Sequence, residues 1–372
     1  MKEMKKTEWR TMPLFEGVDA GQWNDWRWQL RNSVHDAGTL SRFMWLSLSE
    51  HAMIANASAC FPVAVTPYIL SLMNPDDPCC PLRLQFVPRA RELESGECER
   101  EDPLCEESDS PVPGLVHRYP DRVLLLVTTV CAVYCRYCTR RRIVGGVAHF
   151  GRNYMGRALK YIAEHPEIKD VIVSGGDPFM LSDGKIAGVL KRIREIEHVE
   201  IIRVGTRVPA VLPQRVTPRL AAILGRYQPL YVVTQFNHSV EITHESRHAC
   251  ALMADAGIPL SNQTVLLKGV NDEIDVMRRL SRDLLLMRVR PYYLHQCDLA
   301  RGTAHFRVPI DAGLELMRGM RGHMSGLGVP TYMLDPPGCG KVPLQPEYVI
   351  GRSERELRVR GYSGKTFGYP LD

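Results

Sequence analysis

Three cysteines, Cys131, Cys135 and Cys138, lie within eight residues of one another, directly after the apolar run 123–130. The Cys-x3-Cys-x2-Cys spacing lets three thiolates bind three irons of a [4Fe–4S] cube and leaves the fourth iron open to another ligand. A structural zinc site usually needs a fourth ligand, commonly from a second CxxC pair about 15 to 20 residues away. The following residues contain no such pair. The spacing therefore favours an iron–sulfur cluster over zinc or over three buried structural thiols.

Five segments resemble, in the same order along the chain, the lysine 2,3-aminomutase family of radical S-adenosylmethionine enzymes. They are PVPGLVHRYPDR at 111–122, CRYCTRRR at 135–142, SGGDP at 174–178, YYLHQCD at 292–298 and PGCGK at 337–341. The similarity extends from about residue 8 to about residue 351. It implies that the open iron binds the amino and carboxylate groups of S-adenosylmethionine. An electron from the cluster then cleaves this cofactor to a 5′-deoxyadenosyl radical.

A Gly-Gly turn follows another apolar run and suits a close contact between backbone and ligand, because glycine has no side chain to obstruct it. By resemblance, the four residues of this turn contact the ammonium group of S-adenosylmethionine: Ser174, Gly175, Gly176 and Asp177. His238 and Gln263 match further contacts with this cofactor. A lone His or Gln at a strand end is otherwise more often a satisfied polar group of the core.

Lys341 ends the glycine-containing segment 337–341. A lysine amine forms a Schiff base with an aldehyde, and the matching lysine of the family binds pyridoxal 5′-phosphate in this way. Without the resemblance, a surface lysine after a turn would be the simpler interpretation. Arg118, Tyr119 and Arg122 match the residues that anchor the cofactor's phosphate, which guanidinium groups bind through paired hydrogen bonds. The glycine segment is one residue shorter than the family pattern, which usually has four glycines before the lysine.

Three charged residues bear on the substrate. By resemblance, Arg140 binds the substrate carboxylate, whereas Asp298 and Asp335 receive a distal cation. An acidic pair opposite a carboxylate clamp selects a long amino acid with a positive end and argues against glutamate. The implied reaction moves the α-amino group of L-lysine to the β-carbon and gives β-lysine. Arginine, giving β-arginine, stays open, because ammonium and guanidinium differ in size and hydrogen-bond geometry and the sequence does not give the depth of the pocket.

Two other functions remain as alternatives of different classes. An iron–sulfur electron carrier without radical chemistry would leave Lys341 and Arg118 without a role. A zinc-binding structural protein lacks its fourth ligand. The zinc-bearing relatives use cysteines in a C-terminal extension and one after an Asn-Asp pair, but Glu273 follows that pair here and residues 352–372 contain no cysteine. The expected cofactors are therefore a [4Fe–4S] cluster, S-adenosylmethionine and pyridoxal phosphate, without zinc.

Composition and charge limit the partners. The 47 basic and 42 acidic residues leave a net charge of only +5, which does not indicate nucleic acid or an anionic membrane as a partner. The sequence contains no apolar run long enough to span a bilayer and no signal peptide. Eleven irregularly spaced cysteines suit a reducing compartment. We expect a cytoplasmic homo-oligomer that binds a small cationic amino acid and receives electrons from a reductant such as flavodoxin or ferredoxin.

The elements that must position these residues begin near residue 123. Apolar, β-rich runs alternate with helical stretches such as 156–163, 185–196 and 280–287. The runs cover residues 123–130, 171–174, 201–205, 230–235, 260–266, 289–294 and 329–334. Such alternation predicts parallel β/α units covered on both faces. About six units predict an α/β fold, a partial (β/α)6 TIM-like barrel of the radical S-adenosylmethionine type, with its chemistry at the carboxyl ends of the strands.

The flanking regions complete the predicted organisation. Residues 1–115 are expected to be a helical N-terminal region with an acidic connection, residues 116–335 the barrel, and residues 336–372 a short C-terminal extension that carries Lys341. Trp23, Trp26 and Leu30 predict one helix whose apolar stripe packs on the barrel, and a second helix is expected over 39–48. The acidic run 92–109 predicts a solvated connection.

Overall fold

The computed structural model describes residues 9–44, 46–94, 96–145, 150–151 and 153–371. Its main body is a nine-stranded sheet with the strands in chain order from β1 to β9. The inner strands are parallel: β2 (Arg122–Thr128), β3 (Asp170–Gly175), β4 (Ile201–Thr206), β5 (Leu230–Thr234), β6 (Leu260–Leu266), β7 (Val289–Gln296) and β8 (Thr331–Leu334). The edge strands β1 (Leu115–Tyr119) and β9 (Val342–Leu344) are antiparallel to their neighbours.

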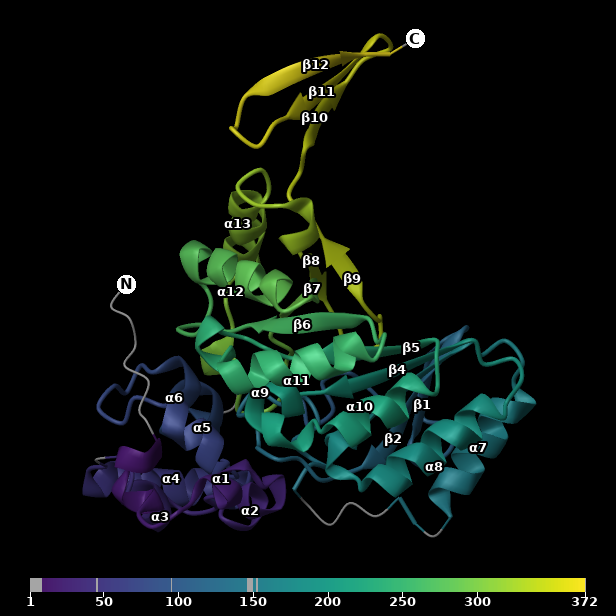
Figure 1. Ribbon diagram of the computed structural model, residues 1–372. Helices are drawn as coiled ribbons and strands as arrows, with labels where there is room; N and C mark the ends of the chain where they lie inside the picture. The colour runs from purple at the N-terminus through teal and green to yellow at the C-terminus, as the bar shows by residue number, and fades with distance from the viewer. Residues whose placement is uncertain (1–8, 45, 95, 146–149, 152, 372) are drawn as a thin grey trace.

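One α-helix connects each pair of consecutive parallel strands, apart from a short additional helix between β4 and β5. The connecting helices are α7 (Tyr154–Glu164), α8 (Asp183–Arg194), α10 (Pro218–Gly225), α11 (His244–Asp255), α12 (Ile274–Leu286) and α13 (Ile310–Met320), and the additional one is α9 (Val208–Val211). The helices lie on the outside of the curved sheet (Figure 1). The predicted β/α units are therefore present. Because the sheet ends in two separate edge strands, the barrel is open, and the prediction of a partial barrel is confirmed.

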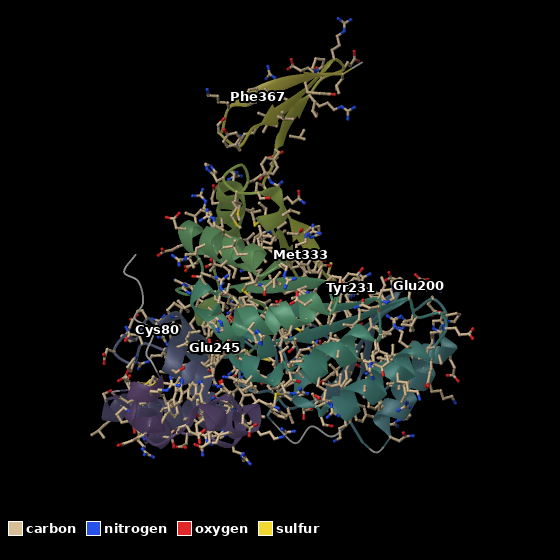
Figure 2. All side chains as sticks on the ribbon, viewed as in Figure 1. Cys80, Glu200, Tyr231, Glu245, Met333 and Phe367 are labelled. Atoms are coloured by element: carbon tan, nitrogen blue, oxygen red, sulfur yellow. The ribbon has the colours of Figure 1, made fainter. Side chains whose placement is uncertain are left out.

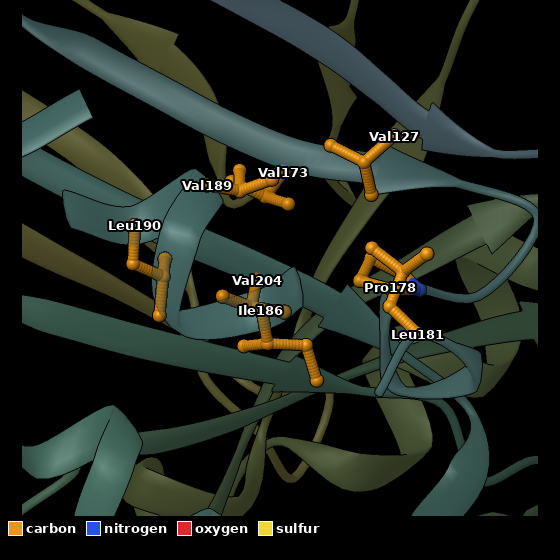
Figure 3. A pocket seen from close by; sticks show the side chains of 8 residues that line it. All are labelled: Val127, Val173, Pro178, Leu181, Ile186, Val189, Leu190 and Val204. Atoms are coloured by element: carbon orange, nitrogen blue, oxygen red, sulfur yellow. The ribbon is translucent and has the colours of Figure 1, made fainter. Parts of the chain in front are cut away.

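Side chains alternate between the two faces of the parallel strands. In β3 and β4 every second residue is buried, as the period of a strand requires. Val173 and Val204 face Ile186 and Leu190 of α8 across a small, wholly apolar gap (Figure 3). The opposite face, toward the barrel interior, carries half-buried residues such as Ser174. The apolar gap therefore belongs to the packing of α8 against the sheet. The interior face is the one whose polar side chains point into the barrel.

The N-terminal region is helical, as predicted, but its helices are short. They are α1 (Ala20–Asn24), α2 (Trp26–Arg31), α3 (Ala37–Ser41), α4 (Leu48–Cys60), α5 (Pro67–Leu72) and α6 (Pro81–Phe86). The expected single helix is divided at Asp25, whose side chain accepts a hydrogen bond from the Arg27 amide and begins α2. The helix expected over 39–48 is wrong, since α3 ends at Ser41 and Ser47 caps a new helix with Glu50.

The tryptophan stripe packs inward. Trp23 is buried and stacks on Trp9 with ring centroids 4.5 Å apart. The Arg215 guanidinium, from the barrel, lies 4.9 Å from the Trp26 ring centroid.

Short 3-10 helices connect many elements: Trp9–Thr11, Pro13–Phe15, Ala90–Leu93, Pro178–Met180, Pro213–Arg215, Ser239–Glu241, Ala304–Phe306 and Gly326–Gly328. Within the described residues, no helix is long and apolar enough to cross a membrane.

The acidic run 92–109 is only partly a solvated connection. Glu94, Glu101 and Glu107 are exposed, as predicted, but the prediction is wrong for Glu92 and Glu106, which are buried. Glu92, whose side chain is 2% exposed, binds the fully buried Arg136 at 2.6 Å and Arg141 at 2.9 Å. Glu106 binds Arg140 at 2.6 Å. A buried charge needs a partner of opposite sign, so the buried carboxylates of the acidic run and the basic block around the cysteines are buried together.

A separate antiparallel sheet follows the barrel, formed by β10 (Val349–Arg352), β11 (Glu356–Arg360) and β12 (Thr366–Pro370). It projects away from the rest of the molecule, and Phe367 lies exposed on it (Figure 2). Strand β9 still belongs to the main sheet, although it lies beyond the predicted barrel boundary at residue 335. The three predicted segment boundaries stay predictions.

Replacing Arg136 by methionine should destabilise the protein strongly, because the buried Glu92 carboxylate loses one of its two arginine partners and two backbone carbonyl oxygens lose their donor. Removing one partner of a buried ion pair costs about 3–5 kcal/mol, so calorimetry on the cluster-free protein should show a Tm several degrees lower. The control is Lys160→Ala, which removes the exposed i,i+4 pair with Glu164, worth about 0.5 kcal/mol or less. Equal Tm shifts would contradict the prediction.

Candidate functional site

The three cysteines lie on a loop that leaves the carboxyl end of β2, as the sequence predicts. All three are half-buried free thiols. Two backbone hydrogen bonds anchor the loop to the N-terminal region, from the Tyr134 amide to the Ala64 carbonyl and from the Arg136 amide to the Gln85 carbonyl. The N-terminal region therefore forms part of the wall that positions the thiols.

The environment of the thiols suits an anionic iron–sulfur group. Burial raises the pKa of Cys138 to about 11 and also raises that of Cys131, and the neighbouring thiols add to both shifts. The Arg140 guanidinium opposes these increases, and Arg207 donates a hydrogen bond to the Cys135 sulfur. Among the described residues no three His, Cys, Asp or Glu side chains are placed to bind a single metal ion. A cube places each thiolate on a different iron, and the guanidinium groups of Arg140 and Arg207 beside the thiols fit such an anionic group.

The two glycines after β3 pack against protein backbone. A Cβ on Gly175, which has φ of +133°, would lie 2.2 Å from the Thr128 carbonyl oxygen, and one on Gly176 would lie 2.4 Å from that of Val130. The Gly176 amide donates to Thr128 at 2.6 Å. These glycines therefore hold the end of β3 against the segment that enters the cysteine loop. The sequence predicts a ligand contact for these glycines and does not reveal this packing.

The two polar side chains of the predicted S-adenosylmethionine loop differ: Asp177 is hydrogen-bonded within the protein, whereas Ser174 faces the barrel interior. The buried Asp177 carboxylate accepts hydrogen bonds from the Thr206 hydroxyl and the Arg207 amide, both at 2.7 Å, and from the Phe179 amide at 3.0 Å. The Ser174 hydroxyl lies 3.3 Å from Arg140 Nη1 on the interior face. Asp177 is engaged in shaping the loop, which leaves Ser174 as the side chain open to a ligand.

His238 and Gln263 differ in their surroundings. His238 begins a short 3-10 helix, where its Nδ1 accepts from the Val240 amide at 3.1 Å. Burial lowers the pKa of His238, so its ring is neutral at pH 7. Gln263 is half-buried in the alternating strand β6. A cofactor role for either residue stays a prediction.

Lys341 lies where an antiparallel hairpin fixes its position. Leu334 at the end of β8 pairs with Val342 at the start of β9, so residues 335–341 form the connecting loop. The Lys341 Nζ lies 2.8 Å from Asp335 Oδ2. The strand register brings these two residues together even though the loop is one residue shorter than the family pattern.

The residues predicted to anchor a phosphate reach this loop from the opposite edge of the sheet. The Lys341 amide donates to the Tyr119 hydroxyl at 2.7 Å, and Arg118 Nη1 lies 3.4 Å from Asp335 Oδ1. The Arg122 guanidinium lies over the Tyr119 ring, 3.8 Å from its centroid. Because β1 and β9 are the two edge strands, this group spans the opening of the barrel. Arg118 and Tyr119 lie in β1 and Arg122 begins β2, so these anchors do not follow the carboxyl end of a parallel strand.

Carboxylates of the acidic run bind two of the predicted ligand-binding arginines. Glu106 accepts from Arg140 Nε and Nη2, which leaves the Nη1 edge toward Ser174. Asp109 lies 2.6 Å from Arg118 Nε. The sequence argument missed these carboxylates. The available signal was the acidic run that precedes the basic segment 135–142 in the chain.

Asp298 is coupled electrostatically to the other predicted groups. Burial raises the pKa of Asp298 to about 7, Lys341 lowers it, and Asp335 and Glu106 raise it further. His295, on the same strand end, was also missed. Burial, with a smaller effect of Lys341, lowers the pKa of His295 to about 3. The segment 292–298 therefore brings a neutral imidazole as well as a carboxylate to the lysine.

Comparisons with known proteins agree with this geometry. A family model described as Radical SAM superfamily matches residues 125–280, and one described as Lysine-2,3-aminomutase matches residues 317–371. The L-lysine 2,3-aminomutase of Clostridium subterminale is 47% identical over 98% of this chain and 88% of its own length. The chain belongs to the lysine 2,3-aminomutase family. The resemblance predicted from the sequence is thereby confirmed.

Other relatives show the range of the lysine 2,3-aminomutase family. The L-lysine 2,3-aminomutase of Acetoanaerobium sticklandii is 48% identical over 94% of this chain and 85% of its own length. The glutamate 2,3-aminomutase of Clostridioides difficile is 41% identical over 98% of this chain and 86% of its own length. A solved radical SAM methyltransferase from Sphaerobacter thermophilus has 17% identity and a TM-score of 0.42 over 59% of this chain and 68% of its own, too low to support an argument. Membership of the radical SAM superfamily implies a [4Fe–4S] cluster and S-adenosylmethionine.

Adding a methyl group at Gly176 should displace the cysteine loop, because the new Cβ would clash with the Val130 carbonyl. We expect Gly176→Ala to bind clearly less iron than the wild type after anaerobic reconstitution, as measured by iron and sulfide analysis. Gly184→Ala is the control, since nothing lies within 4 Å of that position in α8 and alanine favours a helix by about 1 kcal/mol. Wild-type iron content in Gly176→Ala would contradict the packing role.

Proposed function

We propose that the protein is an L-lysine 2,3-aminomutase, which moves the α-amino group of L-lysine to the β-carbon and releases β-lysine. Cys131, Cys135 and Cys138 hold the [4Fe–4S] cluster, and Lys341 binds pyridoxal phosphate. The observation that carries the substrate assignment is the 2.8 Å contact between the Lys341 ammonium and the buried Asp335 carboxylate, close to Asp298. Asp335 already accepts an alkylammonium group, and the charge of Lys341 also acts on Asp298. Once Lys341 engages the cofactor, a substrate ammonium can take its place.

The same charges disfavour glutamate. A side-chain carboxylate placed beside Asp298 and Asp335 would add a third negative charge in a buried position, where like charges repel strongly. Burial has already raised the pKa of Asp298 to about 7. A cationic side chain relieves that repulsion, and this supports lysine over the glutamate named for the C. difficile relative.

The chain's own residues bind the substrate and orient it. When bound, the cluster and S-adenosylmethionine supply a radical that removes hydrogen from the substrate, and pyridoxal phosphate supplies the carbonyl that carries the nitrogen. Glu106 holds one edge of the Arg140 guanidinium, and the Nη1 edge receives the substrate carboxylate. Asp298 and Asp335 bind the distal ammonium. Binding both ends fixes the β-carbon, and such orientation lowers the entropic part of the barrier.

Cofactor anchoring would use the group that spans the barrel opening. Arg118 and Tyr119 reach from the edge strand β1 toward the loop of Lys341, with Arg122 lying over the Tyr119 ring, and guanidinium groups bind a phosphate dianion well. Ser174 and the other residues of its loop, with His238 and Gln263, would contact S-adenosylmethionine. A flavodoxin or ferredoxin would supply the electron.

The deciding experiment is an anaerobic assay of the reconstituted protein with S-adenosylmethionine, pyridoxal phosphate, a reductant and an equimolar mixture of lysine, arginine and glutamate. Mass spectrometry should detect β-lysine as the main isomer, because the acidic pair accepts an alkylammonium group. The Lys341→Ala variant should keep the cluster absorbance and lose the isomer. A product of β-arginine or β-glutamate would contradict the substrate, and an intact cluster without cofactor cleavage would favour an electron carrier.

Lysine binding should strengthen as the pH rises from 6 to 8. The distal ammonium needs the ionised form of Asp298, whose pKa lies at about 7, whereas the ammonium itself stays charged in this range. If only ionised Asp298 binds, the apparent KM should fall about tenfold over these two pH units. Asp298→Asn cannot ionise, so its KM should be higher and should lose this dependence. The same pH dependence in Asp298→Asn would assign it to another group.

A further inference from the structure

Arg207 is a buried arginine that directly follows β4 and touches the cysteine loop. Its side chain is 7% exposed. One guanidinium nitrogen, Nη1, donates to the Cys135 sulfur. The other, Nη2, donates to Gln85 Oε1 at 2.6 Å and lies 3.3 Å from Glu241 Oε2. The mechanism proposed above does not use this arginine.

The partners of Arg207 hold its guanidinium in one orientation. Glu241 is fully buried and accepts from Gln85 Nε2 at 3.0 Å, which fixes both groups that bind Nη2. The guanidinium carbon lies 4.6 Å from the Phe86 ring centroid. The Arg207 backbone amide donates to Asp177 at 2.7 Å. Nη1 therefore stays directed at the Cys135 sulfur, and Arg207 joins the cysteine loop to the loop after β3.

The Arg207 guanidinium contacts both the Cys135 sulfur and the Glu241 carboxylate. The cationic guanidinium contacts the sulfur directly, and the Glu241 carboxylate lies on the other side of the guanidinium. Coulomb energies fall with distance and are large where water is excluded, so Arg207 makes the potential at Cys135 more positive, and Glu241 offsets only part of this effect. In addition, hydrogen bonds to cluster sulfurs are among the factors that set a cluster's reduction potential.

We propose that Arg207 is a positioning residue that acts through Cys135 and raises the reduction potential of the cluster. The reduced cluster carries one more negative charge than the oxidised cluster, so a charge-assisted hydrogen bond to its thiolate ligand stabilises the reduced state more. Glu241 opposes this effect and limits it. The inference rests on the proposed function, because it requires that Cys135 is a ligand of the cluster.

The experiment measures the midpoint potential of the reconstituted cluster by anaerobic redox titration followed by EPR, without S-adenosylmethionine. Arg207→Met should give a more negative midpoint, and Arg207→Lys a value nearer to the wild type, since lysine keeps the charge without the planar fork. Glu241→Gln should shift the midpoint in the positive direction, because Arg207 then loses its opposing charge. A merely structural role cannot produce shifts of opposite sign.

Arg215→Met is the matched control. Arg215 is as buried as Arg207, with 1% of its side chain exposed, but it donates to the Phe179 and Leu181 carbonyls and pairs with Asp183. We expect this variant to lose thermal stability and to keep the wild-type midpoint. An equal negative shift in Arg215→Met would show that loss of any buried arginine lowers the potential, and would overturn the proposal.

The outcomes separate this inference from the function on which it rests. An unchanged midpoint in Arg207→Met, at full iron content, overturns the role of Arg207 and leaves the aminomutase function intact. If Arg207→Met cannot hold a cluster, Arg207→Gln decides, since it keeps a polar side chain and removes only the charge: a negative shift supports the proposal and an unchanged midpoint overturns it. If the wild-type protein itself binds no cluster, the proposed function fails first.

Discussion

Buried guanidinium groups must be neutralised, and this constraint determines how the regions of the molecule fit together. Arg136 and Arg140 flank the third cysteine and lie largely out of water, so each needs a carboxylate close by. Glu92 and Glu106 meet that need, and both precede the barrel in the chain. The N-terminal region is therefore held to the barrel by charge as well as by its apolar helices.

The two edges of the open sheet meet through side chains. A closed barrel would pair its first and last strands through their backbones, whereas here Arg118 and Tyr119 from one edge reach Asp335 and Lys341 from the other. The residues matched to pyridoxal phosphate therefore stand at the gap. A ligand bound there would contact both edges, which connects occupancy of the site to closure of the sheet.

Local patterns in the sequence were sufficient to predict most strands of the barrel. Strands such as β5 are short runs of apolar, β-branched residues, and such runs are visible without any knowledge of the fold. The motif residues around Lys341 could be assigned by resemblance, and hairpin register explains why Lys341 meets Asp335. Burial of the acidic run could not be predicted in this way. The arginine partners of Glu92 and Glu106 lie 34 to 49 residues further along the chain, and local composition alone resembles a solvated segment.

The pairing of Glu92 and Glu106 with later arginines also bears on the order in which the protein is made. During synthesis the acidic run leaves the ribosome before the basic block that neutralises it, and domains generally fold as units from the N-terminus. These carboxylates must therefore stay hydrated until residues 136–141 have emerged. The helical region and the barrel consequently mature as one folding unit, and a chain cut between them would leave unpaired charges on both fragments.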